Sequence, residues 1–151
     1  MPDYGKLFES KVAASLKKLD GMSMRVLDGG ARAKIPQWCD YIYAPVGAET
    51  FFIECKSTGE RSLPFANIKD HQLDDLVDIA DGSGGTRFGV FAIEFRVHDR
   101  MFLIDAGRLA TYMATCSRKS LTVEAAESIG RECAKTRGGY DLHVLDTGVS
   151  I

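Results

Sequence analysis

Residues 38–56, WCDYIYAPVGAETFFIECK, form the part of the sequence that decides the fold. Two runs within it, 38–43 and 50–56, are rich in aromatic and β-branched residues and are typical of β-strands. The segment 45–49 between them contains proline and glycine, which favour a turn over a continued strand. We therefore predict that the two runs pair as an antiparallel hairpin.

The expected register of this hairpin brings two acidic side chains together. If the loop closes a pair between Ala44 and Thr50, Asp40 lies opposite Glu54, with Cβ atoms about 4.5–5.5 Å apart. Lys56 shares the face of Glu54 because side chains alternate along a strand. Directly opposed like charges destabilise a sheet, so this charged face requires an explanation.

Two explanations fit the charged face of the hairpin. In the first, the face is solvated and Lys56 balances one of the carboxylates. In the second, Asp40 and Glu54 hold a divalent cation, since Mg²⁺ typically takes one or two carboxylates together with water and phosphate oxygens. Lys56 then positions the attacking water or stabilises charge at a phosphate.

The hydrophobic pattern predicts the remaining elements. Helices are expected over 5–19, 68–80, 106–113 and 121–129, and strands over 24–27, 88–95, 101–104 and, as an edge strand, 140–145. This order favours an α/β or α+β domain with a mixed central sheet flanked by helices. With 151 residues, 45% of them hydrophobic, the chain fits one domain over 1–151, with its core over 5–113 and a C-terminal helix and edge strand over 117–146.

The composition narrows the possible classes of protein. Nineteen Lys and Arg against twenty-one Asp and Glu give a net charge of −2, which neither indicates nor excludes nucleic-acid binding. The sequence contains no apolar run of about 20 residues, so we expect no membrane span. The N-terminal MPDYGKLFES lacks the apolar core of a signal peptide, so we expect a cytoplasmic protein. The four cysteines form no CxxC pair and are expected to be reduced thiols.

The hairpin resembles a known nuclease signature. Asp40, thirteen intervening residues and then Glu54-Cys55-Lys56 look like the PD-(D/E)XK motif. The surrounding motifs are GKLFE at 5–9, SLPF at 62–65, IKDHQ at 68–72, the apolar run 88–93 and FLI at 102–104. Together they are similar to the RecU-type Holliday junction resolvases of bacteria and phages, over about 5–113.

This resemblance implies a fold and an activity. The fold is a restriction-endonuclease-like α/β domain, and the activity is Mg²⁺-dependent resolution of four-way DNA junctions, with Mn²⁺ able to substitute. Asp40 and Glu54 are implied as metal ligands, Lys56 as the catalytic lysine, and Gln72 as the residue that completes the metal site or orients a water. Its spacing from Glu54 is one residue shorter than in the family. Trp38 stands where the family often has a threonine, and segment 28–37 is shorter than the family's projecting stalk.

Glu9 is a further candidate for the catalytic site. It lies at the edge of the apolar face of the first predicted helix, from which a carboxylate could reach the sheet margin. The alternative is a surface ion pair with Lys6 or Lys11. Four basic residues flank the candidate site and are expected either to contact DNA phosphates or to lie on solvated surface: Arg32, Lys34, Arg61 and Lys69.

The expected partner is branched double-stranded DNA. Because a four-way junction has approximate two-fold symmetry and must be cut in two strands, a homodimer is expected, with the apolar first helix and the 88–95 region as candidate interfaces. Residues 82–85, GSGG, lack the Lys-Ser/Thr ending of a P-loop, so no nucleotide cofactor is expected. Two alternatives stay open: a PD-(D/E)XK nuclease of other specificity, and a non-catalytic DNA-binding module on the same fold.

Overall fold

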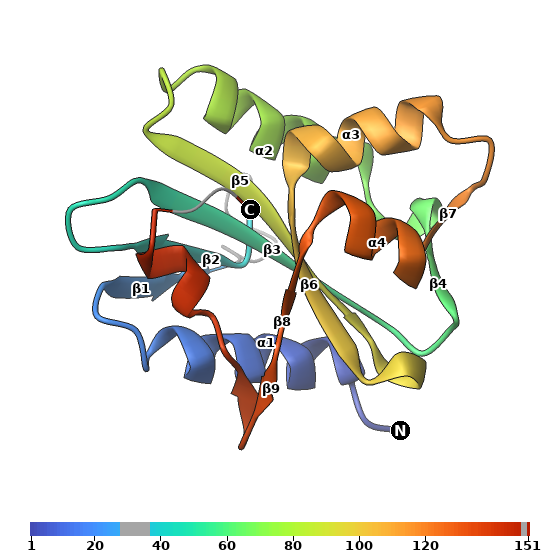
Figure 1. Cartoon of the computed structure of the whole chain (residues 1–151), viewed down its shortest axis with the longest axis horizontal. Coiled ribbons are helices and arrows are strands. Elements are labelled where there is room, and N and C mark those ends of the chain that lie inside the picture. Colours follow the sequence, from blue (N-terminus) through green and yellow to red (C-terminus); the bar gives the residue numbers. More distant parts are fainter. Residues whose placement is uncertain (28–36, 149–150) are drawn as a thin grey trace.

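A six-stranded mixed β-sheet with helices on both faces forms the centre of the computed structural model, which describes residues 1–27, 37–148 and 151 (Figure 1). The sheet has the order β1-β2-β3-β5-β6-β8. Its strands are β1 (Met22–Arg25), β2 (Tyr41–Ala44), β3 (Thr50–Thr58), β5 (Arg87–Phe95), β6 (Arg100–Asp105) and β8 (Arg131–Cys133). Strands β3 and β5 pair in parallel and the other neighbours pair antiparallel, so the predicted mixed sheet is confirmed.

Four α-helices and several short elements surround this sheet. The helices are α1 (Tyr4–Leu16), α2 (Asp70–Asp81), α3 (Ala106–Thr115) and α4 (Val123–Ile129). The short strands β4 (Ser62–Pro64) and β7 (Ser120–Thr122) pair with each other, as do β9 (Lys135–Thr136) and β10 (Gly139–Tyr140). The residues that the structure describes also form three 3₁₀ turns: η2 (Phe65–Asn67), η3 (Arg96–His98) and η4 (His143–Asp146). Among the described residues, no helix has the length and apolar character that crossing a membrane requires.

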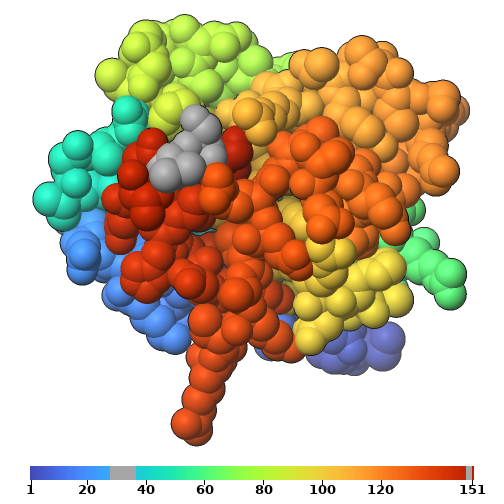
Figure 2. All heavy atoms as spheres, in the orientation of Figure 1, coloured from blue at the N-terminus to red at the C-terminus, as the bar shows by residue number. Residues whose placement is uncertain are grey.

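Two hydrophobic cores lie on opposite faces of the sheet. Helix α1 buries Phe8, Val12 and Leu16 against one face, together with residues of the C-terminal segment. Helices α2, α3 and α4 cover the other face (Figure 1). Strand β5 lies between both cores, which explains why its sequence is nearly continuously apolar. Figure 2 shows the segment after α4, drawn orange to red, packed over the centre of the molecule.

The hairpin register agrees with the prediction. Tyr41 pairs with Ile53 and Ile42 pairs with Phe52, as closure between Ala44 and Thr50 requires. Side chains at even positions of β3 face α2, and those at odd positions face α1. The charged residues of β3 that carry the predicted chemistry therefore point toward α2.

Several boundaries and one edge differ from the sequence predictions. The first helix ends at Leu16 instead of residue 19, and β1 starts two residues earlier than expected. The predicted edge strand 140–145 is wrong: the extended part ends at Tyr140, and η4 follows at His143. The strand at that edge of the sheet is β8, whose three residues pair with β6. A strand this short carries no alternation pattern, so only its tertiary partner defines it.

Candidate active site

Asp40 is held against β3 directly before the start of β2. Its backbone N–H donates to the carbonyl oxygen of Ile53 at 2.9 Å, which extends the hairpin by one residue. Its carboxylate Oδ2 accepts a hydrogen bond from the backbone N–H of Cys55 at 2.8 Å. The Asp40 carboxylate thus takes the place of a backbone acceptor for the N–H of Cys55, before the first paired residue of β2. This hydrogen bond fixes the carboxylate beside Glu54.

Glu54, Lys56 and Gln72 form a closed triangle of polar contacts on the α2 face. Gln72 Nε2 donates to Glu54 Oε1 at 2.6 Å, and Lys56 Nζ donates to Gln72 Oε1 at 2.8 Å. Lys56 Nζ also lies 3.3 Å from Glu54 Oε1. The structure therefore brings Gln72 to the pair on β3, although its spacing along the sequence is shorter than in the resembled family.

Helix α2 explains why Gln72 reaches this position. The helix starts at Asp70, so Gln72 lies in its first turn, and the next residue, Leu73, is buried in the core. Leu76, one turn further on, is fully buried and anchors the helix on β5. Two buried leucines on one face thus set the rotation of the helix and direct its first turn toward β3.

Burial and charge shift the pKa values of the two carboxyl groups. Glu54 is only 5% exposed, and burial together with the neighbouring Asp40 raises its pKa from 4.5 to about 7, against the opposing effect of Lys56. Burial also raises the pKa of Asp40, while the hydrogen bond from Cys55 and the charge of Lys56 lower it. Two close carboxyl groups in a partly desolvated site form an arrangement that a cation stabilises.

This donor set fits a hard divalent cation. Mg²⁺ accepts one or two carboxylates, an amide oxygen and several waters at close to octahedral geometry. Within 1–27, 37–148 and 151, no group of three or more His, Cys, Asp or Glu side chains is arranged to hold a metal. The residues Asp40 and Glu54 thus suit an ion that keeps water and substrate ligands, and not a closed all-protein site such as structural zinc.

Glu9 lies near this cluster from the opposite face of the sheet. Burial and the charge of Asp40 raise its pKa, so its carboxyl group is within electrostatic reach of the site. Its ion-pair partner is Arg25 of β1, with 3.8 Å between Oε2 and Nη2. The predicted pairing of Glu9 with Lys6 or Lys11 is wrong, because these lysines pair with Asp3 and Glu94.

The structure describes two of the four basic residues predicted to bind DNA. Arg32 and Lys34 lie outside the described residues. Lys69 is exposed directly before α2, and its backbone N–H points to Gln72 Oε1 at 3.4 Å. Arg61 is exposed in the loop between β3 and β4. Lys69 thus borders the cluster, whereas no contact joins Arg61 to it among the described residues.

Sequence reasoning missed two polar groups near the site. Gln37 Nε2 lies 3.4 Å from Asp40 Oδ1, three residues before the acid it contacts. On the other face of the sheet, Glu94 is 4% exposed and accepts hydrogen bonds from Ser57, Lys11 and Tyr140. The sequence does contain a signal for this group, because Glu94 interrupts the apolar run 88–95 and a buried charge needs hydrogen-bond or ion-pair partners.

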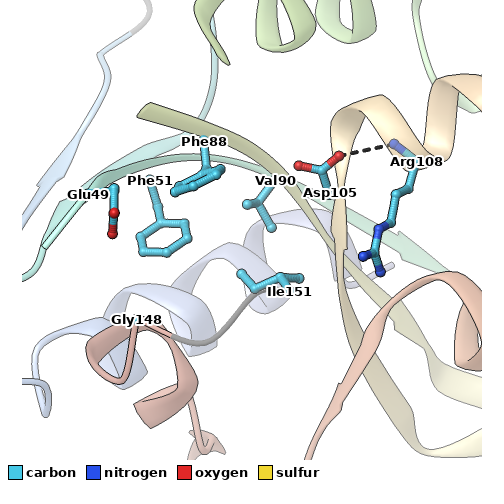
Figure 3. A pocket seen from close by; sticks show the side chains of 8 residues that line it. All are labelled: Glu49, Phe51, Phe88, Val90, Asp105, Arg108, Gly148 and Ile151. Carbon is cyan, nitrogen blue, oxygen red and sulfur yellow. Dashed lines mark hydrogen bonds between the residues drawn. The ribbon is translucent and has the colours of Figure 1, made fainter. Parts of the chain in front are cut away.

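A pocket of about 410 Å³ opens elsewhere, on the α1 face of the sheet (Figure 3). Stacked Phe51 and Phe88 form part of its wall, and Asp105 and Arg108 lie at its side. None of the predicted site residues lines it. The candidate active site is therefore the polar cluster around Glu54 and not this pocket.

The raised pKa of Glu54 predicts a pH-dependent cost in stability without metal. A carboxyl group whose pKa is raised on folding contributes stability that is fully present below about 4.5 and is lost as pH rises through about 7. In EDTA, Glu54→Gln should therefore stabilise the protein relative to wild type, by a margin that grows by about 2–3 kcal/mol from pH 5 to pH 8. Chemical denaturation at both pH values measures the margin. Glu60→Gln, at an exposed position, serves as the control, and a margin independent of pH would contradict the prediction.

Comparisons with known proteins find a matching protein family and a matching solved structure. The family model for recombination protein U matches residues 12–146. Among solved structures, Hjc of Archaeoglobus fulgidus, a Holliday junction resolvase from an archaeal hyperthermophile, aligns with a TM-score of 0.61 and 20% identity. This alignment covers 85% of the present chain and 95% of the Hjc chain, and at this identity it shows a shared fold. No curated protein sequence matches the chain.

Proposed function

Because the chain belongs to the recombination protein U family, we propose that it is a Holliday junction resolvase, an endonuclease that cuts four-way DNA junctions. Its fold is the restriction-endonuclease-like α/β fold expected from the sequence, shared with the archaeal resolvase Hjc. One observation carries the assignment of the active site: Asp40, Glu54, Lys56 and Gln72 converge beside the start of β2.

Each residue of this cluster has a proposed role. Asp40 and Glu54 hold the divalent metal on which resolvases of this family depend, and we assign Mg²⁺, with Mn²⁺ able to substitute. When bound there, the metal would polarise the scissile phosphate and lower the pKa of a bound water. Lys56 positions the nucleophile and stabilises charge at the phosphate. Glu9, at the margin of the cluster, supports the same site with its carboxylate.

Two alternative roles follow for Gln72 in this site. In the present geometry its amide holds Glu54 through Nε2 and Lys56 through Oε1, so it fixes both side chains. If Oε1 instead ligated the metal, it would use one of its two lone pairs, and the other could still accept the hydrogen bond from Lys56. In either role, Gln72 is a residue of the proposed active site.

The proposed substrate and setting follow from the family. The enzyme binds branched double-stranded DNA in the cytoplasm of a bacterium or of a phage-infected cell, and it works as a homodimer. Lys69 and Arg61 contact phosphates beside the cleavage site, together with Arg32 and Lys34. No nucleotide cofactor takes part.

Cleavage assays on three DNA substrates test the proposed function. Labelled four-way junction, linear duplex and single-stranded DNA are incubated with Mg²⁺ and, separately, with EDTA. We expect cleavage of the junction alone, and only with Mg²⁺. Equal cleavage of duplex or single strands would instead support a nuclease of other specificity, and binding without cleavage would support a DNA-binding module.

Junction binding should weaken steeply with salt despite the net charge of −2. Release of counterions from DNA depends on local phosphate contacts, and we expect at least about a 30-fold loss of affinity between about 50 and 200 mM salt. Fluorescence anisotropy with labelled junction measures the slope. Lys69→Ala should reduce the slope by about one unit, while Lys17→Ala, at an exposed position at the end of α1 on the opposite face of the sheet from α2, should leave it unchanged. An affinity that barely responds to salt would argue against DNA-backbone contacts.

A further inference from the structure

The outer edge of β1 carries backbone groups that no described residue pairs with. Strand β1 ends the six-stranded sheet, and all four of its residues are exposed. The backbone N–H of Val26 donates to the carbonyl oxygen of Asp40, so the groups of Val26 and Met24 face β2. Because alternate residues of an antiparallel strand point to opposite sides, the N–H and C=O groups of Ser23 and Arg25 point outward.

Large apolar side chains gather along the same edge. The exposed ones on β1 or next to the ends of β1 and β2 are Met22 (80% exposed), Met24 (59%), Leu27 (76%), Trp38 (47%) and Val46 (79%). An unpaired strand edge combined with exposed apolar side chains is typical of an interaction surface. Since the open groups belong to a strand edge, the partner that satisfies them is another strand.

We propose that β1 pairs antiparallel with β1 of a second copy of this chain, with Met24 opposite Met24 of the partner subunit. This inference names the interface of the homodimer and in that respect rests on the proposed function. A two-fold axis between antiparallel strands lets the same strand serve as both partners. In this register, Ser23 of each chain exchanges two hydrogen bonds with Arg25 of the partner subunit, which satisfies all the outward groups.

The neighbouring registers are excluded by features of the chain. A shift in one direction places Arg25 opposite Arg25 of the partner subunit, and directly opposed like charges destabilise a sheet. A shift in the other direction requires the backbone N–H of Gly21 as a ladder donor, but this group already donates to Tyr43 Oη at 2.9 Å. The register with Met24 opposite Met24 of the partner subunit avoids both the opposed arginines and the need for the occupied N–H of Gly21.

The apolar residues of the two regions expected from the sequence to form the dimer interface are buried within the single chain. The apolar face of α1 is buried against the sheet, with Phe8 and Val12 at most 1% exposed. Strand β5, which contains most of the 88–95 region, lies between β3 and β6 inside the sheet. The apolar residues that suggested both regions therefore form the core of the single chain.

Pairing through β1 sets the geometry of the two active sites. Strand β3 is two strands from β1, so five strand spacings separate the two β3 strands, or about 24 Å across the sheet. A two-fold axis perpendicular to the joined sheet leaves both Glu54 clusters on the same face. The dimer thus presents two sites to one face of a two-fold symmetric DNA, as paired cutting requires.

A charge-pairing experiment tests this interface. Met24→Glu and Met24→Lys are prepared separately, and the mass of each is measured by sedimentation against a monomer mass of 16.6 kDa. We expect each variant alone to dimerise at least about tenfold more weakly than wild type, because like charges then oppose each other at the axis. An equimolar mixture of the two should regain the dimer, since residue 24 opposes residue 24. Val97→Glu, which changes an exposed valine of η3, should stay dimeric.

The outcomes separate the interface from the activity. A monomeric wild-type protein, variants that stay dimeric, or a mixture that fails to regain the dimer would overturn the proposed interface. On a plasmid cruciform, the separate Met24 variants should release singly nicked circles where wild type makes paired cuts. If the masses behave as expected but no junction is cleaved, the interface stands and the proposed activity fails.

Discussion

Replacing Glu54 with glutamine is expected to reduce the rate of junction cleavage by at least about 1000-fold while changing junction affinity by less than about threefold. The amide has nearly the shape of the carboxylate, so Gln72 retains a hydrogen-bond acceptor at this position. The substitution removes the negative charge that we propose holds the metal, and with it the water activation and charge stabilisation that a metal would supply. Single-turnover cleavage and anisotropy binding measure the two effects separately.

Affinity is expected to survive because phosphate contacts from basic residues supply it. Glu60→Gln removes an exposed glutamate from the β3–β4 loop and should leave both cleavage and binding unchanged. Circular dichroism verifies that the Glu54→Gln variant is folded. A folded variant that loses binding and cleavage in equal measure would show that Glu54 contacts the substrate and not the metal.

Replacing Lys56 with alanine should lower the cleavage rate by about 100- to 1000-fold, the usual cost of removing one preorganised electrostatic group. A second effect follows from the position of the ammonium group 3.3 Å from Glu54. Lys56 lowers the pKa of Glu54, which burial and Asp40 raise to about 7. Without this cation, Glu54 ionises at higher pH and the metal competes with a proton over a wider range. The pH–rate profile at limiting Mg²⁺ should therefore shift upward.

Lys56→Arg is the matched variant for this profile. It keeps the positive charge, so the profile should stay near its wild-type position, although the larger guanidinium lowers the rate. Profiles recorded between pH 6 and 9 for wild type and both variants test the expectation. An alanine variant with a reduced rate and an unmoved profile would assign Lys56 to the substrate alone, without an effect on Glu54.

The hairpin and its charged face could be predicted from the sequence because the determinants are local. Alternation along 50–56 and the length of one loop suffice to place Asp40 opposite Glu54. The buried character of β5 is equally visible in its composition. Gln72 is different: its contact with Glu54 depends on how α2 packs, and it was expected from family resemblance alone.

The features that escaped prediction depend on distant partners. Strand β8 has three residues and exists through its ladder with β6. The ion pair of Glu9 with Arg25 joins two elements whose proximity depends on the packing of α1 under the sheet. The interface residues of β1 were unrecognised because an apolar methionine in a strand predicts burial, and only the strand order shows that β1 is last.

The parallel pairing of β3 with β5 determines when this chain can become an enzyme. The residues it joins are far apart in sequence, as in the contact of Ser57 with Glu94 across 37 positions, and closing such a loop makes folding slow. The helix that carries Gln72 lies inside this loop, so Glu54 and Lys56 gain their partner only after β5 has docked. In a chain still emerging from the ribosome, Asp40, Glu54 and Lys56 are already synthesised but do not yet form an organised site. We therefore expect nuclease activity to arise only after synthesis and folding have passed β5, so that unfinished chains do not cut DNA.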